Sequence, residues 1–380
     1  MAKRKPAARG KAVRKPVKKR AAKPIVKKAT KARRKTPTGA KAKSTASARS
    51  RSAGAAKPSG RATRTRATAA KRAGPSAVAE PPTLRAIQDA IEAAREWLGE
   101  RRDYCGYLAR RDAARGAPEL ARHLRGDLMA KQGSDGSWNS GDLAASAEAI
   151  WRLLDLGLGT DSLAVSRGLD WLYSRRDAEG AYGSGCTPAR HEQRVCEHFL
   201  SGFFSPGPSD EPQEITLGNG QTVSADASAR LLASARGLRS ALRAKPGDPR
   251  ANASVSGFRG LPLYLEYGGT FTPAVLVGAL QALAWVQGVW SSELAAGLET
   301  LAAAQEEDGC WPNVEFFFVL ETLLEVNHPV AWQMLKRAIP RILEIQHRYG
   351  AWGRRHVAAQ TWIAVQVLER ALDEHRGGRS

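Results

Sequence analysis

Acidic residues are missing from the first 79 positions of this 380-residue chain, although those positions hold 27 of its 59 lysines and arginines. The other 32 basic residues face all 37 acidic ones, so the rest of the chain has a formal net charge of −5. The overall charge of +22 therefore belongs to the N-terminal segment and does not describe a folded domain.

Long apolar runs and cysteines are also scarce. No stretch of about 18 apolar residues occurs, so we expect no membrane-spanning helix and no integral membrane protein. Residues 1–20 are basic without a following apolar stretch, so we expect no secretory signal. Four cysteines are too few for a disulfide scaffold, so a reducing cytoplasm is the expected compartment.

Large apolar side chains are nearly absent from residues 1–72, where Val13, Val17, Ile25 and Val26 are the only ones. Such a segment buries too little surface to offset its ordering entropy, so we predict a disordered Lys/Arg/Ala/Pro-rich tail over residues 1–82. Its composition resembles the basic tails of linker histones and of some bacterial nucleoid proteins. Residues 1–79 are expected to bind nucleic acid without sequence preference and to associate with the nucleoid. An anionic membrane, another polyanion or no partner are the alternatives.

Residues 83–380 are rich in alanine and leucine and favour helices. Leu120, Leu124 and Leu128 lie on one face of a helix expected to begin at Pro118. Two stretches rich in proline, glycine and polar residues, at about 183–221 and 245–260, interrupt the pattern and are predicted to be loop insertions.

A short signature recurs between the predicted helices. Three copies have the pattern Gln, then Gly four residues later, then Trp two residues after that: Gln132, Gly136 and Trp138; Gln305, Gly309 and Trp311; Gln346, Gly350 and Trp352. Weaker copies are Gly180-Ala181-Tyr182 and Gly269-Thr270-Phe271. The aromatic residues are 44, 89, 40 and 41 positions apart, so a degraded sixth copy is expected near 222–226. Six units of helix pairs follow, stacked against their neighbours without strands.

Each signature residue has a predicted structural role. The glycine supplies a turn that other residues adopt only at a cost. The aromatic ring is expected to pack on the neighbouring repeat. The glutamine amide is expected to cap free N–H groups at the start of the next helix.

The pattern Gln-x-x-Asp-Gly-x-Trp resembles the QW motif of squalene and oxidosqualene cyclases and the related repeats of prenyltransferase β-subunits. The resemblance covers about residues 118–375. It implies an all-α (α/α)6 toroid, with outer helices before each motif and inner helices after it, and an isoprenoid bound in a central cavity. The same fold occurs in protein-thioester domains and carbohydrate-active enzymes, so it does not fix the function.

The acid motifs of the cyclases are absent. Class II cyclases protonate an alkene with Asp-x-Asp-Asp or Asp-Cys-Thr-Ala-Glu, and neither string occurs in the sequence. The diphosphate–magnesium motif Asp-Asp-x-x-Asp of class I synthases is absent as well. We therefore do not expect a standard squalene cyclase.

Two cysteines and two histidines cluster just after Tyr182: Cys186, His191, Cys196 and His198. Prenyltransferases hold zinc with Asp, Cys and His, and these residue types suit zinc. We therefore predict a candidate zinc site at these four residues, although their spacing matches no standard motif. A catalytic Cys–His pair, or thiols and histidines without chemistry, are the alternatives.

Other polar residues have simpler expected roles. Cys105 and Cys310 are predicted to be structural. Asp142 and Asp226 are expected to cap inner helices, and Glu148 and Glu321 also lie near inner-helix starts. Glu315 is a candidate catalytic acid in the cavity, or a residue stabilising a helix start. The tryptophans within helices, among them Trp151, Trp285 and Trp362, are expected in the core or in an aromatic cavity wall.

Two functions are consistent with these observations. The first is a cyclase-like or prenyltransferase-like domain that binds an apolar or peptide ligand in a central cavity; if it is an enzyme, a metal-dependent transferase or terpenoid-cyclase-like activity is expected. The second is a non-enzymatic scaffold that the basic tail tethers to nucleic acid.

Overall fold

The computed structural model describes residues 82–114, 116–175, 214–224, 226–252, 254–255, 258, 267–269, 271–286 and 292–377. The chain divides into two compact units, Met1–Arg72 and Ala73–Ser380, and the described residues all belong to the second. The predicted tail up to residue 81 and the Cys186–His198 cluster lie outside the described residues. Most of the predicted insertion at about 183–221 lies outside them too, whereas most of the one at 245–260 is described and contains the short helix η4 (Pro249–Ala251).

The described elements are almost all helices. In chain order they are α1 (Leu84–Gly99), α2 (Tyr104–Asp112), α3 (Pro118–Ala130), η1 (Asn139–Gly141), α4 (Leu143–Asp155), α5 (Leu163–Ser174), β1 (Ile215–Thr216), β2 (Thr222–Val223), α7 (Asp226–Ala244), η4 (Pro249–Ala251), α9 (Pro273–Leu283), α10 (Ser292–Ala303), α11 (Phe316–Val326), α12 (Pro329–Glu344) and α13 (Val357–Gly377). No helix in this part of the chain is both long and apolar enough to cross a membrane.

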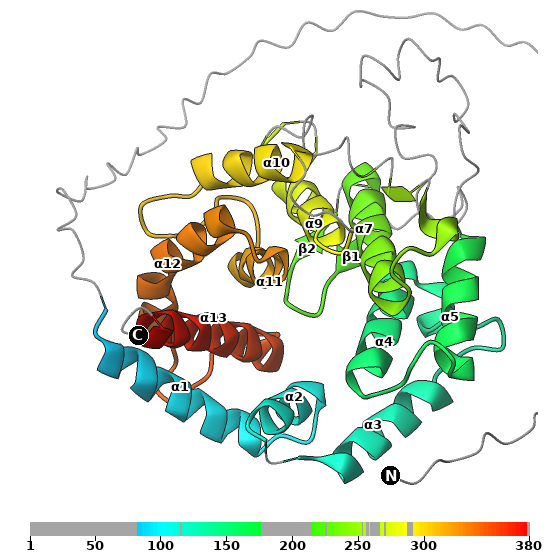
Figure 1. The fold of residues 1–380 in the computed structure, drawn as a ribbon, viewed down its shortest axis with the longest axis horizontal. Coiled ribbons are helices and arrows are strands. Elements are labelled where there is room, and N and C mark those ends of the chain that lie inside the picture. Colours follow the sequence, from blue (N-terminus) through cyan, green and yellow to red (C-terminus); the bar gives the residue numbers. More distant parts are fainter. Residues whose placement is uncertain are drawn as a thin grey trace, which may run out of the picture. The chain divides into compact units, whose positions relative to one another are not determined.

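The helices of the second unit form two concentric layers (Figure 1). In the inner layer, α4 packs on α7, α7 on α9, α9 on α11, α11 on α13, and α13 on α2. Helices α1, α3, α5, α10 and α12 lie outside them. Because α1 contacts both α12 and α13, the first and last helices close the ring. This arrangement confirms the predicted all-α (α/α)6 toroid.

Local sequence accounts for the helix boundaries and buried faces. Pro118 occupies the first turn of α3, and the Asp142 carboxylate caps α4 by accepting a hydrogen bond from the backbone N–H of Ala145, as predicted. The apolar stripe of α10 is buried at Leu294 and Leu298. The sequence periodicity therefore identified these helices correctly.

The segment before α7 contains the predicted degraded signature copy, within a hairpin that was not predicted. Strands β1 and β2 form this antiparallel hairpin, with Ile215 opposite Val223. Its turn has the same backbone hydrogen bonds as the three signatures, and Gly220, at φ +106°, occupies the place of the signature glycine. Thr222 stands where the signatures have tryptophan, so the copy near 222–226 keeps the turn and lacks the aromatic ring. The expectation that residues 118–375 contain no strand was wrong.

The described residues contain six inner helices, as expected for six units, but these helices do not match the predicted signature copies one to one. Helices α4 and α7 pack directly on each other, so the inner ring passes from one to the other without a further helix. The sixth inner helix is α2, paired with α1, and this pair precedes the first signature at Gln132. Residues 176–213, within and just before the 89-residue spacing, lie outside the described residues, and the loop insertion predicted there stays a prediction.

Each of the three signature glutamines follows one outer helix and donates a hydrogen bond to the next outer helix. Nε2 of Gln132 donates to the carbonyl oxygen of Ala164 in α5, at 2.9 Å. Nε2 of Gln305 makes the same contact with Met334 in α12, at 3.0 Å. Each amide also donates to the carbonyl oxygen of its own signature glycine. The predicted capping of N–H groups was wrong, because the amide bonds carbonyls, and Oε1 of Gln305 is buried without a partner among the described residues.

Each signature tryptophan donates a hydrogen bond to the outer helix that precedes it. Nε1 of Trp138, Trp311 and Trp352 donates to a carbonyl oxygen ten residues earlier, in α3, α10 and α12 respectively. The ring of Trp138 also packs on the next outer helix, where a Cβ at Gly168 would lie 2.9 Å from it. Packing of the aromatic ring on the neighbouring repeat is therefore confirmed for Trp138.

Phe271 departs from this pattern. Each of the three tryptophans precedes its inner helix by the same distance along the chain, whereas Phe271 is separated from α9 by Thr272 alone. The prediction that Phe271 occupies an equivalent position was wrong. Tyr182, the other weak copy, lies outside the described residues.

Candidate functional site: the central cavity

A cavity of about 320 Å³ lies at the centre of the ring. Residues from five inner helices (α2, α4, α7, α11 and α13) line it, together with the hairpin tip and Trp285, which follows α9. Part of the wall is apolar, including Leu324 on α11 and Ile363 on α13. The rest carries an unusual density of charge.

The charged residues form stripes at helical spacing. Arg236, Arg239 and Arg243 recur along α7, and Glu321 and Glu325 lie one turn apart on α11. The opposite faces of these helices pack in the protein core, so the charged stripes point into the lumen. Their burial requires that each charge find a partner.

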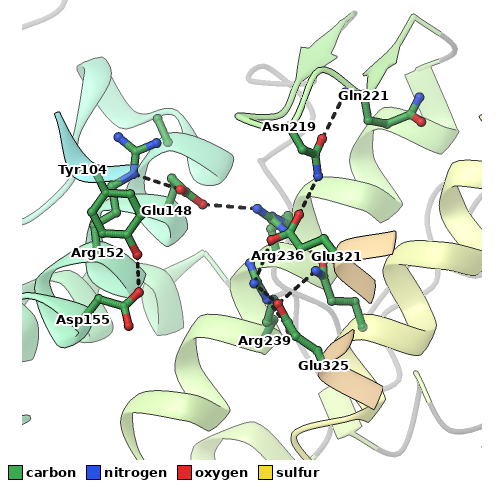
Figure 2. A network of polar contacts seen from close by, with 12 residues as sticks. Tyr104, Glu148, Arg152, Asp155, Asn219, Gln221, Arg236, Arg239, Glu321 and Glu325 are labelled. Atoms are coloured by element: carbon green, nitrogen blue, oxygen red, sulfur yellow. Dashed lines mark hydrogen bonds and ion pairs between the residues drawn. The ribbon is translucent and has the colours of Figure 1, made fainter. Parts of the chain in front are cut away.

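Glu148 on α4 joins two of the arginines (Figure 2). Its carboxylate accepts from Nε of Arg152 at 2.9 Å and from Nη2 of Arg236 at 3.2 Å. Burial alone would raise the pKa of Glu148, but Arg152, Arg236 and Arg239 lower it to about 2. The Glu148 carboxylate is therefore ionised at neutral pH.

Arg239 is the most enclosed cation of the cavity, with 3% of its side chain exposed. It donates to Glu321 at 3.0 Å and to both carboxylate oxygens of Glu325. Glu325 also accepts from Nε1 of Trp285 at 3.0 Å and from Gln281 at 3.2 Å. These partners satisfy the buried carboxylates of α11.

Asp155, at the end of α4, links α2 to α7. Arg243 donates to both of its oxygens, at 2.6 and 3.2 Å. The Tyr104 hydroxyl also donates to this carboxylate, and burial followed by the charge of Asp155 raises the Tyr104 pKa well above its usual value. Arg111 lies 3.5 Å from the same carboxylate.

Aromatic rings pack against two of the arginines in the cavity wall. The guanidinium carbons of Arg239 and Arg243 lie 3.5 and 3.9 Å from the ring centroid of Trp151. Trp285 meets Trp151 edge to face, with centroids 5.3 Å apart. Cation–π contacts of this kind hold the guanidinium groups in place along the wall.

The hairpin tip lies in the middle of the inner ring (Figure 1). Asn219 is buried, and its Nδ2 donates to Glu321 at 2.6 Å (Figure 2). Its carbonyl oxygen accepts from Gln360 of α13 at 2.8 Å. Gln221 accepts from the backbone N–H of Glu315 at 2.8 Å. The hairpin thus joins α11 to α13 across the lumen.

The lining of the cavity holds one more arginine than carboxylates. Five arginines line it (Arg111, Arg152, Arg236, Arg239 and Arg243) against the four carboxylates of Glu148, Asp155, Glu321 and Glu325. Arg111 also donates to Asp112, outside the lining, at 2.8 Å, so each arginine has a carboxylate partner. All four carboxylates accept hydrogen bonds or ion pairs from arginine. The terminal nitrogens of Arg152 have no hydrogen-bond partner among the described residues, because its contacts are Glu148 through Nε and the Tyr104 ring. The wall therefore offers an N–H donor pair to an anion.

Glu315, the candidate cavity acid, does not line this cavity. It precedes α11 without capping it, and Oε1 accepts from Nε2 of Gln360 at 3.1 Å. Burial raises its pKa, while the backbone N–H of Phe317 and the charge of His356 act in the opposite direction. The glutamate thus lies beside the turn of the hairpin and is not part of the cavity lining.

The predicted cysteine and histidine sites remain predictions. Cys186, His191, Cys196 and His198 all lie outside the described residues. Within the described ranges, no cluster of three or more His, Cys, Asp or Glu side chains is suited to hold a metal ion. Cys105 is buried in the wall of the cavity.

Most of the cavity wall was not predicted from the sequence. Glu148, Glu321, Cys105 and three of the tryptophans were among the candidate residues, but none of the five arginines was. The available signal was the helical spacing of charges on α7, together with Glu148, Arg152 and Asp155 on α4. A charged stripe normally indicates a solvent-exposed face, but the inner helices of a double ring have no outward-facing surface.

No family model and no curated protein matches this sequence. A protein from Actinoplanes of solved structure has a TM-score of 0.47 at 16% identity, and the alignment covers 75% of this chain and 99% of that one. Type II terpene cyclase MstE from Scytonema, in complex with merosterolic acid A, gives 0.48 at 14% identity over 76% and 98%. A second MstE variant, in complex with geranylgeranyl dihydroxybenzoate, gives 0.47 at 12% over 76% and 98%. These values do not indicate a function, and the toroid rests on the helix packing described above.

Proposed function

We propose that the toroid binds a small ligand with an apolar body and one anionic group in its central cavity. The observation that carries the proposal is Arg152, which lines a cavity of about 320 Å³ and whose terminal nitrogens have no hydrogen-bond partner among the described residues. These nitrogens would donate to the anionic group of the ligand. The ligand's apolar body would lie against Leu324, Trp362 and Ile363.

The state of the carboxylates supports binding without acid-initiated cyclisation. Protonation of an alkene needs a carboxylic acid that still carries its proton. Arginine holds Glu148 ionised, and the other three carboxylates of the wall each accept from arginine. The cavity therefore suits a binding function better than class II cyclase chemistry. A peptide ending in a carboxylate offers the same combination of groups as a small amphipathic molecule.

Decyl phosphate and decanol, which share an apolar chain and differ in charge, test this proposal by titration calorimetry. We expect decyl phosphate to bind more tightly than decanol, and Arg152→Gln to weaken its binding about tenfold, since a hydrogen bond to a charged group contributes about 1.5–3 kcal/mol. Arg122→Gln, on the exposed side of α3, is the matched control. Equal binding of the two probes, or an Arg152→Gln variant with unchanged affinity, would contradict the proposal.

A metal-dependent transferase activity is a separate proposal, carried by Cys186, His191, Cys196 and His198 and by zinc's preference for these ligands. Zinc analysis of the purified full-length protein and of Cys196→Ala tests it. Stoichiometric zinc that the variant loses would support the site. Zinc-free protein would leave the cluster without a metal function.

Tethering to nucleic acid is the second candidate function, because 27 basic residues and no acidic ones occupy positions 1–79. Each phosphate contact releases counterions, so affinity for duplex DNA should fall steeply with salt, at a log–log slope of about −0.9 per contact. Gel shifts of the full chain and of a chain lacking residues 1–79 test it. Equally tight binding by the truncated chain at about 150 mM salt would contradict this function.

A further inference from the structure

A second pocket, of about 530 Å³, adjoins the central cavity at the start of helices α2 and α13. The two share Tyr104, Cys105, Arg152, Gly218 and Ala359. The rest of its wall includes aromatic and basic residues that do not line the central cavity: Trp97, Arg101, Tyr349, Arg355 and His356. We call this second site the rim pocket.

Aromatic rings are unusually accessible at the rim pocket. Tyr349 is 56% exposed, and few other large apolar or aromatic side chains in the described ranges are as exposed. It stacks on His347, with ring centroids 5.1 Å apart and planes at 14°. Trp97 lies 6.5 Å away from it, at 41°. His347 is fixed in turn, because its Nε2 is 2.9 Å from the carbonyl oxygen of Gly353. The rings thus form a supported platform beside the pocket.

The surroundings of these rings are basic. The Arg101 guanidinium lies over Trp97 at 4.6 Å and pairs with Asp103 at 2.6 Å. Arg355 is exposed and forms no ion pair or hydrogen bond with any described residue. Arg101, Arg152 and Arg355 face only one carboxylate in the pocket wall, that of Asp103. The rim pocket therefore presents net positive charge next to exposed rings.

We propose that the rim pocket binds a nucleotide, with its base stacked on Tyr349 and Trp97 and its phosphate on Arg355 and Arg101. Aromatic side chains stack on every base, so they provide affinity without sequence preference. Guanidinium groups match phosphate oxygens in charge and geometry. The site is distinct from the central cavity, and its function does not depend on the function proposed there.

The predicted tail cannot supply this chemistry. Residues 1–79 contain lysine and arginine but no aromatic residue, so they can neutralise phosphates and cannot stack on bases. The rim pocket, unlike residues 1–79, would distinguish accessible bases from a bare polyanion. The nucleotide can be free, or it can belong to a single strand, and the same stacking serves both sources.

Full-length protein with the tail retained tests the inference. Fluorescence anisotropy measures binding of a single-stranded oligothymidylate, a duplex of the same length and inorganic polyphosphate, and calorimetry measures thymidine monophosphate. We expect Tyr349→Ala to weaken single-strand binding at least about fivefold, the lower end of the effect of losing one stacking side chain. Tyr349→Phe should retain affinity within about twofold, because it keeps the ring. Duplex and polyphosphate affinities should not change in either variant.

Further variants separate stacking from charge and from misfolding. Arg355→Ala should weaken the binding of both the single strand and the mononucleotide. Arg122→Ala and Leu163→Ala, at exposed positions elsewhere on the ring, should weaken the binding of neither. If Tyr349→Ala weakens binding of thymidine monophosphate, a free nucleotide is a sufficient ligand for the rim pocket. If it weakens binding of the oligothymidylate alone, the ligand is a single strand. Unchanged single-strand and mononucleotide affinity in Tyr349→Ala would overturn the inference. An equal loss for polyphosphate would do so too, since polyphosphate has no base.

Discussion

Nε2 of Gln346 donates a hydrogen bond of 2.9 Å to the carbonyl oxygen of Ala90, across 256 positions of sequence. Gln346 belongs to the last signature of the chain, and Ala90 lies in the first helix. A Cβ added to Gly350, in the same signature, would lie 2.6 Å from the carbonyl oxygen of Ala93. One signature thus closes the ring by the contacts that join neighbouring repeats elsewhere.

Gln346→Ala should destabilise the toroid. The substitution leaves the carbonyl oxygens of Ala90 and Gly350 without their donor, so we expect the free energy of unfolding to fall by about 2 kcal/mol. Urea denaturation of the variant measures this difference. Gln333→Ala, an exposed glutamine on α12, is the control and should change the free energy by less than about 0.5 kcal/mol. Similar effects of the two substitutions would mean that ring closure does not depend on Gln346.

Gly309→Ala should be strongly destabilising, because Gly309 has φ +84° and an added Cβ would lie 2.5 Å from the carbonyl oxygen of Arg337. We expect a loss of about 2 kcal/mol or more. Gly126→Ala is the matched substitution: Gly126 lies in α3 with nothing within 4 Å of the new Cβ. It should stabilise the protein by about 0.5–1 kcal/mol. Thermal melts of both variants should therefore shift in opposite directions.

Protonation of Glu148 should account for part of the loss of stability in acid. Its pKa is lowered from 4.5 to about 2, so its contribution is complete above pH 4.5 and disappears as the pH falls towards 2. The lost contribution amounts to about 3 kcal/mol at most. Urea denaturation at a series of pH values should show a shallower decline for Glu148→Gln than for the unmodified chain. Parallel curves would mean that Glu148 is not held ionised by its arginines.

Two of the four cysteines should resist alkylation. Burial, followed by the charge of Asp103, raises the pKa of the Cys105 thiol to about 12. Burial, followed by the charge of Asp308, raises that of Cys310 to about 11. Since the thiolate is the nucleophile, iodoacetamide at pH 8 should modify both slowly, and in urea quickly. Peptide mass mapping after timed labelling checks this; rapid modification of Cys105 in the folded protein would contradict its burial.

Local sequence was enough to predict the helices and their stacking. The stripes of Leu294 and Leu298 and the repeated Gln-x-x-x-Gly-x-Trp pattern are short-range features, and they encode amphipathic helices joined by one kind of turn. A constant period requires equivalent contacts between neighbours, which predicts stacked helix pairs, and the resemblance to the QW-motif cyclases implied that the stack closes into a toroid. The pattern did not show that α4 and α7 are neighbours in the inner ring.

The candidate sites depended on tertiary structure. Arg152 on α4, Arg236 on α7 and Glu321 on α11 lie far apart in sequence, and each could belong to a solvent-exposed face. Only closure of the ring turns these faces inward, where burial forces the charges to pair and leaves the terminal nitrogens of Arg152 without a hydrogen-bond partner among the described residues. The rim pocket has the same origin, because Trp97 and Tyr349 meet only where the last signature returns to the first helix. The sequence by itself determined the repeating unit and the charge of the tail, and the closed ring decided which side chains face each other.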